Sequence, residues 1–348
     1  MTAEISVREF DDDPGAWNRW VETAQDARFC HRYEWLQLVR DVYGGEPHYL
    51  AARRDGAIVG ALAMMLRSVI GEGRVLISVP LADEGAVLAA DDDAEEALLN
   101  RSFELVEELN ASRLELRQRR PAPGTEADLS RVNMEMDLPD DPDALWDSFK
   151  SKLRNKTRKA GREGLAAHRA DDLHAAISDS FYPVYCENTR DLGSPMHSER
   201  FFHEVADRFP DASEIMVVRD GDTAVGAGYA IRWRERFAVP WASSLRRYFK
   251  QRPNNMLYWE LMRLAIESGC SVFDFGRSPK DSGTYKFKEQ WGAEPVQLHY
   301  CNYGNAATPA DTDNRERLAY RMFSSMWQRM PLPIARVVGP KIFARLPI

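Results

Sequence analysis

The sequence lacks the features of an exported or membrane-spanning protein. Its longest apolar run, residues 57–66, is about half of the roughly 20 residues that a helix needs to cross a bilayer. Residues 1–13 carry five acidic residues, the wrong charge for the start of a signal peptide. No C-x-x-C motif pairs the four cysteines, Cys30, Cys186, Cys270 and Cys301. We therefore expect reduced thiols and a cytoplasmic protein, with at most peripheral contact to the inner face of the membrane.

The sequence also lacks a surplus of positive charge and a metal-binding motif. Lys and Arg number 46 against 54 Asp and Glu, so the formal net charge is −8. A protein that grips nucleic acid with its whole surface should be basic, so any polyanion must bind a local patch. The seven histidines form no H-E-x-x-H motif, and we expect no metal site. A length of 348 residues favours two domains.

An internal echo indicates that one domain is used twice. Residues 49–63 and 215–230 each contain an apolar strand, an Asp-Gly pair and a second strand that carries Val-Gly-Ala. Asp-Gly between two strands is a strong hairpin signal, because a type I′ turn needs positive φ at both central residues. Gly60 and Gly226 lie 166 residues apart, close to half of the chain. The alternative is two unrelated hairpins that look alike.

The elements around the two hairpins occur in the same order. Helical patterns precede the hairpins at 14–25, 33–42, 171–189 and 198–209. Each hairpin is followed by a strand, a long helix, a short strand, a helix and a strand. The first three of these are expected at 74–79, 93–110 and 113–118, and again at 237–243, 254–268 and 271–275. This order resembles that of a GNAT-type acyltransferase domain.

The fold class that follows is α/β, with mixed sheets in two tandem GNAT-like acyltransferase domains and a short C-terminal helical tail. We predict an N-terminal domain at 1–140, a C-terminal domain at 141–305 and a basic, aromatic tail at 306–348. A Pro- and Asp-rich stretch at 138–143 marks the boundary, and Asp143 is the predicted N-cap of the next helix.

Residues 150–162 depart most from the overall charge. They hold seven basic residues and no acidic one, spaced so that two faces of a helix are positive. Their mutual repulsion favours an anionic partner such as a diphosphate, a tRNA acceptor stem or a headgroup. The alternative is a solvated cationic face.

A second candidate site is the loop at 189–197, which Gly193 and Pro195 define. Arg190 can present its guanidinium to a phosphate or carboxylate. Alternatively, Arg190 pairs with Asp191 and only shapes the loop.

Residues 272–295 are the densest segment. A strand ends at Phe275 and a helix begins near Thr284, and ligands of open α/β sheets bind beyond the carboxyl ends of strands. The polar side chains expected there are Asp274, Arg277, Ser278, Tyr285 and Lys288. A lysine or tyrosine in this place stabilises the oxyanion of an acyl transfer. The alternative, which we favour for the aromatic residues, is that Phe273, Phe275, Phe287 and Trp291 belong to the core.

A further absence bears on the donor. GNAT enzymes that use CoA bind its pyrophosphate on a Gly-rich loop between a strand and a helix, where main-chain N–H groups approach the phosphates. The corresponding stretch 248–257 has no glycine, and 81–87 in the first half is acidic. Acyl-CoA is therefore the less favoured donor.

The tail combines cations with large apolar side chains. Residues 316–348 hold six basic residues besides Phe323, Trp327 and Phe343. This composition suits a membrane interface beside anionic lipids, or packing on the second domain.

Four segments resemble the FemAB family, in particular its branch associated with exosortase/PEP-CTERM exopolysaccharide systems. They are residues 152–160, 190–195, 273–278 and 283–292. The resemblance implies twin GNAT-like domains and transfer of an aminoacyl group from aminoacyl-tRNA to an amine on a peptidoglycan precursor. It places Phe287 and Lys288 near the tRNA terminus and the reacting carbonyl. It also implies that Arg154, Lys156 and Arg158 contact precursor phosphates, whereas the helical arm of some members is missing here.

These observations lead to one expected function and two alternatives. The expected function is N-acyl transfer, with an aminoacyl or acyl group moved to an amine of a cell-envelope or exopolysaccharide precursor and no bound cofactor. Lys288 would stabilise the oxyanion, with Tyr285 and Asp274 as hydrogen-bond partners. The substrate would be bound by Arg154, Lys156, Arg158, Arg190, Asp191, Arg277, Ser278 and Phe287. The alternatives are an acyl-CoA-dependent GNAT and a non-catalytic module that binds a lipid-linked precursor or tRNA.

Overall fold

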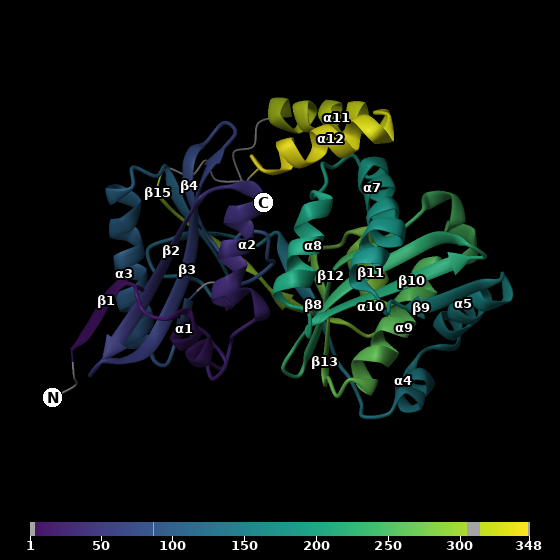
Figure 1. Ribbon diagram of the computed structural model, residues 1–348, viewed down its shortest axis with the longest axis horizontal. Helices are drawn as coiled ribbons and strands as arrows, with labels where there is room; N and C mark the ends of the chain where they lie inside the picture. Colours follow the sequence, from purple (N-terminus) through teal and green to yellow (C-terminus); the bar gives the residue numbers. More distant parts are fainter. Residues whose placement is uncertain (1–3, 86, 305–313, 347–348) are drawn as a thin grey trace. The chain divides into compact units, whose positions relative to one another are not determined.

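A computed structural model describes residues 4–85, 87–304 and 314–346, with the backbone alone for 314–320 (Figure 1). Their contacts form two compact units. Unit 1 contains the described residues of Met1–Arg131, Gln297–Thr312 and Ala344–Ile348. Unit 2 contains those of Val132–Val296 and Asp313–Phe343.

Unit 1 is a mixed sheet with three α-helices among its described residues. The sheet order is β1-β2-β3-β4-β6-β15-β7, and β5 pairs with β3. The strands are β1 (Ile5–Glu9), β2 (Glu46–Arg54), β3 (Ala57–Val69), β4 (Gly73–Ser78), β5 (Val87–Ala89), β6 (Arg113–Gln118), β7 (Glu126–Asp128) and β15 (His299–Gly304). The helices are α1 (Pro14–Val21), α2 (Tyr33–Tyr43) and α3 (Asp92–Glu108), with a 3₁₀ turn η1 (Phe29–His31). Leucines on the inner face of α3 pack with β2, β3 and β6 into one apolar core.

Unit 2 contains a second mixed sheet, in the order β14-β8-β13-β12-β11-β10-β9. The strands are β8 (Arg131–Asp137), β9 (Leu165–Arg169), β10 (Ser213–Asp220), β11 (Thr223–Trp233), β12 (Arg236–Ser244), β13 (Val272–Pro279) and β14 (Glu294–Gln297). The α-helices are α4 (Pro142–Ser148), α5 (Ser151–Arg162), α6 (Leu173–Ala176), α7 (Tyr182–Asp191), α8 (Glu199–Arg208), α9 (Pro253–Glu267), α10 (Gly283–Glu289), α11 (Asn314–Gln328) and α12 (Leu332–Phe343). A π turn, η2 (Ile177–Phe181), joins α6 to α7, and a 3₁₀ segment, η3 (Arg246–Gln251), precedes α9.

The predicted duplication extends to an irregularity of the backbone. In the first hairpin the register shifts between Ala52 and Arg53, opposite Val59 of β3. In the second hairpin it shifts between Val218 and Arg219, opposite Val225 of β11. All three pairs of equivalent residues are 166 apart, as Gly60 and Gly226 are. Two unrelated hairpins would not share a β-bulge at the same position, so the echo is a structural repeat.

The two hairpin turns differ in detail. Asp55 and Gly56 have φ of 51° and 82°, as a type I′ turn requires. In the second hairpin Asp220 pairs with Thr223, so Gly221 and Asp222 form the turn, one residue later than the Asp-Gly pattern suggests. Gly221 takes the positive φ there, at 55°.

Other expectations about the elements need correction. Among the described residues no helix follows β6; the chain turns through 119–125 into β7. Helix α4 is capped by Asp141 rather than Asp143, because the Asp141 side chain accepts hydrogen bonds from two main-chain N–H groups and Pro142 occupies the first helical position. The helix expected at 171–189 is divided by the π turn η2.

The units do not follow the continuous ranges 1–140 and 141–305. β8 comes before residue 140 but pairs within the sheet of unit 2. Conversely, β15 follows all strands of unit 2 and pairs with β6 and β7 of unit 1. Unit 2 therefore begins with β8, and the sheet of unit 1 includes one strand, β15, from the other end of the sequence.

Helices α11 and α12 make up most of the predicted tail and pack against α7 in unit 2 (Figure 1). Trp327 of α11 and Ala335 of α12 are fully buried, which agrees with the packing alternative for the tail. Residues 306–313 and 347–348 of the tail lie outside the described residues. Among the described residues, no helix combines the length and the apolar character that crossing a bilayer requires.

Candidate active site

The central feature of unit 2 is the separation of two parallel strands. β12 and β13 pair at only three positions, from Arg236 with Val272 to Ala238 with Asp274. Beyond that point β12 continues to Ser244 and β13 to Pro279, and among the described residues the two strands do not pair with each other again. The separating carboxyl ends of two parallel strands are where an open α/β sheet binds its ligand.

Gly276 and Lys288 set the course of β13 after the separation. Gly276 has φ of 74°, a conformation that side chains with a Cβ rarely adopt. Lys288 on α10 reaches back, and its Nζ donates hydrogen bonds to the carbonyl oxygens of Gly276 and Arg277, each at 2.9 Å. The Lys288 side chain is buried. The lysine predicted to act on the substrate therefore also anchors the main chain of the site.

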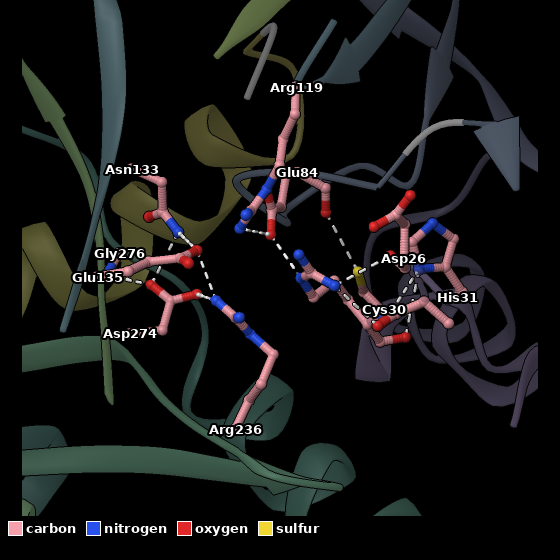
Figure 2. Close-up of polar contacts among 12 residues, drawn as sticks. Asp26, Cys30, His31, Glu84, Arg119, Asn133, Glu135, Arg236, Asp274 and Gly276 are labelled. Atoms are coloured by element: carbon pink, nitrogen blue, oxygen red, sulfur yellow. Dashed lines mark hydrogen bonds and ion pairs between the residues drawn. The ribbon is translucent and has the colours of Figure 1, made fainter. Parts of the chain in front are cut away.

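Asp274 lies in a buried polar cluster beside this loop (Figure 2). Its Oδ1 accepts hydrogen bonds from Asn133 Nδ2 at 3.0 Å and from the main-chain N–H of Gly276 at 2.8 Å. Its Oδ2 lies 3.4 Å from Arg236, which also pairs with Glu135 at 2.5 Å. Asn133 further donates to Glu135 at 2.8 Å. Asp274 thus holds Gly276 in place from one side while Lys288 holds it from the other.

Ser278 and Trp291 each have a buried polar atom in this segment that the packing of the described residues leaves without a partner, and Ser278 is the one near the end of β13. It is fully buried, and its Oγ has no hydrogen-bond partner among the described residues. A buried hydroxyl without a partner costs free energy and points to a missing ligand or water. Ser278 was predicted as a substrate-binding residue, and this position suits that role.

The aromatic side chains of the segment are core, as expected. Phe273, Phe275 and Trp291 are buried, and Phe287 packs edge-on against Tyr258 with ring centroids 5.2 Å apart. Tyr285 is half-buried against the same core. Its main-chain N–H donates to Ser282, the N-cap of α10, which fixes the start of that helix.

The three α5 cations that were predicted to contact substrate each have an interaction partner within unit 2. Arg154 pairs with Asp147 at 3.1 Å, and the Arg158 guanidinium lies 5.2 Å from the centre of the Trp146 ring. Lys156 donates to Gln290 Oε1 at 2.6 Å, just beyond α10. Of the three, Lys156 is therefore the one placed beside the Lys288 helix.

Burial, and after it the positive charges of Arg252 and Lys152, lower the pKa of Lys156 below its usual value. Helices α5 and α9 pack against each other, and Arg252, directly before α9, lies close enough to Lys156 to act on it. The structure thereby extends the predicted positive patch to a segment that the sequence analysis noted only for its missing glycines.

That segment, residues 246–252, is a missed basic and aromatic surface. Its exposed side chains are Arg246, Arg247, Phe249, Lys250 and Arg252. Arg247 lies over the Tyr248 ring and pairs with Glu187. The signal was present in the sequence, since four cations and two aromatic residues stand within seven positions.

Arg190 and Asp191 belong to a different part of unit 2. Arg190 Nε donates to Asp191 Oδ1 at 2.8 Å, and its guanidinium donates to the carbonyl oxygen of Met330. These contacts agree with the loop-shaping alternative. Both residues lie at the end of α7, and their described contacts join them to the segment after α11, not to the loop after β13.

In unit 1, two parallel strands also separate, but the segment that follows β4 occupies the space between their carboxyl ends. β4 and β6 pair in parallel at three positions that end with Ile77 and Glu115. The following segment is fixed there because Trp35 donates to the carbonyl oxygen of Pro80 at 2.9 Å and Arg117 to that of Ala82 at 3.0 Å.

A buried carboxylate completes the filling in unit 1 (Figure 2). Glu84 accepts hydrogen bonds from Arg28 at 2.5 Å and from Arg119 at 2.5 and 2.7 Å. Burial alone would raise the pKa of Glu84, but these two arginines lower it to about 2. The acidic stretch at 81–87 therefore serves an internal ion cluster in unit 1.

Comparisons with known proteins agree with this geometry. Residues 147–289 match the family model described as the acetyltransferase (GNAT) domain. Among curated proteins, none is significantly similar to the chain in sequence. A crystal structure of FemX is similar over 91% of this chain and 100% of its own, with a TM-score of 0.67 and 14% identity.

Two further solved structures share the fold. A tandem GNAT protein from the clavulanic acid biosynthesis pathway covers 86% of this chain and 98% of its own, with a TM-score of 0.55 and 11% identity. The structure of L-PGS from Bacillus licheniformis covers 84% and 97%, with a TM-score of 0.55 and 14% identity. The chain thus consists of two tandem GNAT-like domains with C-terminal helices, and its second domain carries the GNAT acyltransferase match.

Proposed function

We propose that the chain is an N-acyltransferase whose unit 2 moves an aminoacyl group from aminoacyl-tRNA to an amine of an envelope or exopolysaccharide precursor. The GNAT match in unit 2 and the fold shared with FemX support acyl transfer. The choice of aminoacyl-tRNA as donor depends on the surface that precedes α9.

The basic and aromatic surface of residues 246–252 is the observation that carries the proposal. A CoA pyrophosphate needs main-chain N–H groups at the start of the helix. Here Pro253 has no N–H, and Arg252 before it adopts φ of 66°, a left-handed conformation uncommon for a side chain of this size. Exposed cations beside an exposed aromatic ring instead suit a single-stranded nucleic acid end, whose phosphates pair with the cations and whose bases stack on the ring.

The chemistry expected at the site is attack of the acceptor amine on the carbonyl carbon of the ester. A new C–N bond forms, the ester C–O bond breaks, and the ribose oxygen leaves with a proton. Ser278 Oγ, buried and unpartnered, is suited to donate a hydrogen bond to the carbonyl oxygen as it becomes negative. Lys288 adds positive charge there while it holds two carbonyl groups in place.

Two groups are proposed to take the proton that the amine loses, namely Asp274 and the phosphates of the substrate. Asp274 is already bound by Asn133 and Gly276 through one oxygen, so proton transfer would use the oxygen near Arg236. Tyr285 and Arg277 remain proposed contacts to the substrate.

The donor is tested by measuring how the full chain binds an aminoacylated (charged) oligonucleotide that reproduces a tRNA acceptor stem. Fluorescence anisotropy measures the binding. We expect Phe249→Ala to weaken binding about tenfold, from the loss of one stacked base. Lys250→Gln with Arg252→Gln should lower the slope of log affinity against log salt by about 1.4. Arg263→Gln, an exposed cation on α9, is the matched control and should leave binding unchanged. Equal loss in the control would contradict a specific surface.

The transfer itself is tested with radiolabelled aminoacyl-tRNA and fractionated cell-envelope and exopolysaccharide precursors. Mass spectrometry of the labelled product identifies both the amino acid and the acceptor. The exosortase-associated branch of the resemblance predicts an exopolysaccharide acceptor rather than a cell-wall peptide. Failure of every precursor to accept label while tRNA still binds would favour a non-catalytic binding module.

The second candidate is a GNAT that uses acyl-CoA, and the matched acetyltransferase (GNAT) family model favours it. Calorimetric titration with acetyl-CoA separates the two. Micromolar binding of acetyl-CoA together with no binding of the charged oligonucleotide would replace aminoacyl-tRNA as the donor.

A further inference from the structure

Helices α11 and α12 of unit 2 each expose large apolar side chains. Those that are more than half exposed are Met322 (65%), Met326 (60%), Ile334 (52%) and Val337 (63%). Leu192, at the end of α7 against which both helices pack, is 66% exposed. Four of the eight large apolar side chains that the described residues expose are in this hairpin of helices.

The exposed residues recur with helical spacing. In α11 the face reads Met322, Met326 and Arg329, and in α12 it reads Ile334, Val337 and Lys341. Steps of three and four residues place each set on one side of its helix. Each helix therefore presents two apolar side chains and one cation on its outer face.

The opposite faces of the two helices fix the hairpin to unit 2. Trp327 of α11 is fully buried, and a Cβ on Gly339 of α12 would lie 3.4 Å from its ring. Ala335 and Phe343 are buried on the same side of α12. The outer face is thus not a part of the core that happens to be open; each helix has a separate buried side.

Charge distinguishes this face from a general apolar patch. From residue 317 onward the sequence contains six cations and no acidic residue. Arg336 forms an ion pair with Glu199 and lies over the Tyr182 ring. Arg329 and Lys341 are exposed and have no described ion pair within the described residues. Apolar side chains flanked by uncompensated cations on one face are the pattern of a helix that lies on an anionic bilayer.

We propose that the outer face of α11 and α12 docks on the surface of an anionic lipid bilayer. Met322, Met326, Ile334 and Val337 enter the boundary between headgroups and acyl chains, and Arg329 and Lys341 pair with lipid phosphates. Among the side chains that the structure describes, this face has no exposed aromatic ring on which a nucleic acid base could stack, which separates it from residues 246–252. This inference does not depend on the donor or on the acyl-transfer chemistry.

The test is flotation of the full chain with vesicles of phosphatidylcholine alone or with about one third phosphatidylglycerol. We expect flotation with the anionic vesicles, and its loss at about 1 M salt, where surface charges are screened. Arg329→Gln with Lys341→Gln should weaken partitioning about 25-fold, since each cation contributes about fivefold. Met326→Gln with Val337→Gln should weaken it at least about tenfold.

Matched controls are Leu129→Gln and Arg19→Gln, which change an exposed apolar residue and an exposed cation in unit 1. They should float as the unchanged chain does, and circular dichroism confirms that each variant is folded. Failure of the unchanged chain to float, or equal flotation with uncharged vesicles, would overturn the proposal. Light scattering that finds a dimer, dispersed by Met326→Gln with Val337→Gln, would overturn it in favour of a second copy of the chain.

Discussion

Replacement of Lys288 by methionine separates the two roles that the structure gives to this side chain. Methionine keeps an unbranched apolar chain of similar length but donates no hydrogen bonds. The carbonyl oxygens of Gly276 and Arg277, each 2.9 Å from Nζ, then lose this donor inside a buried site. A buried acceptor without its partner costs about 1–3 kcal/mol, so we expect Lys288→Met to lower the free energy of unfolding by about 3 kcal/mol.

Urea unfolding followed by circular dichroism measures this loss. With a slope of about 3 kcal/mol/M, the unfolding midpoint should fall by about 1 M. Lys286→Met is the matched control, because Lys286 is exposed on the same short helix. The free energy of unfolding of Lys286→Met should differ from that of the unchanged chain by less than about 0.5 kcal/mol. Equal midpoints for Lys288→Met and the unchanged chain would refute the anchoring argument.

The same variant tests the proposed chemistry under conditions where it is folded. We expect aminoacyl transfer to fall at least about a hundredfold, the usual cost of removing one group that stabilises an oxyanion. Unchanged transfer by folded Lys288→Met would remove Lys288 from the mechanism and leave it with its structural role alone.

Three further outcomes follow from the described contacts. Glu84 has a pKa of about 2, below its usual 4.5, so its contribution of about 3 kcal/mol is present above pH 4.5 and is lost as the pH falls toward 2. Acid titration by circular dichroism should show this loss in the unchanged chain and not in Glu84→Gln, which starts less stable. Gly276→Ala should destabilise by at least about 1 kcal/mol in urea because φ is 74°, whereas Gly283→Ala at an ordinary, open helix position should be neutral. Arg252→Gly should keep or raise the thermal midpoint, since glycine tolerates φ of 66°, and should still weaken binding of the charged oligonucleotide.

Much of the fold could be predicted because its signals are local. The hairpins, the long helices and the strand Arg113–Gln118 follow from periodicity and turn residues within short windows. The spacing of 166 residues predicted a repeat, and the repeat includes the bulges at Val59 and Val225. Which sheet a strand joins is not a local property. β15 has the pattern of an ordinary strand, and nothing within it indicates that it pairs with strands of unit 1 at the other end of the chain. In the same way, nothing within β8 indicates that unit 2 begins with it.

The candidate site likewise has a part that local sequence predicts and a part that depends on residues distant in sequence. Asp274, Ser278, Tyr285 and Lys288 stand within fifteen residues, so one short window of sequence predicts them as a single site. In the structure, Asp274 and Lys288 both hydrogen-bond Gly276. A short window of sequence could not predict the residues that hydrogen-bond Asp274. Asn133 lies 141 residues earlier in the sequence, and its contact depends on β8 joining the sheet of unit 2. The cations and aromatic residues of 246–252 are evident in the sequence, but this stretch was interpreted only through its lack of glycine.

A duplication leaves the question of which copy carries the chemistry, and the two strand separations differ in a way that decides our proposal. In unit 1, a ligand would have to displace the Pro80 and Ala82 carbonyl groups from Trp35 and Arg117. It would also have to leave the buried Glu84 charge without its arginines, and breaking a buried ion pair costs about 3–5 kcal/mol. In unit 2 the corresponding loop is held from behind by Lys288, and the buried Ser278 hydroxyl lacks a partner among the described residues. A substrate that satisfies this hydroxyl gains a hydrogen bond without breaking one, which is why we place the acyl transfer in unit 2.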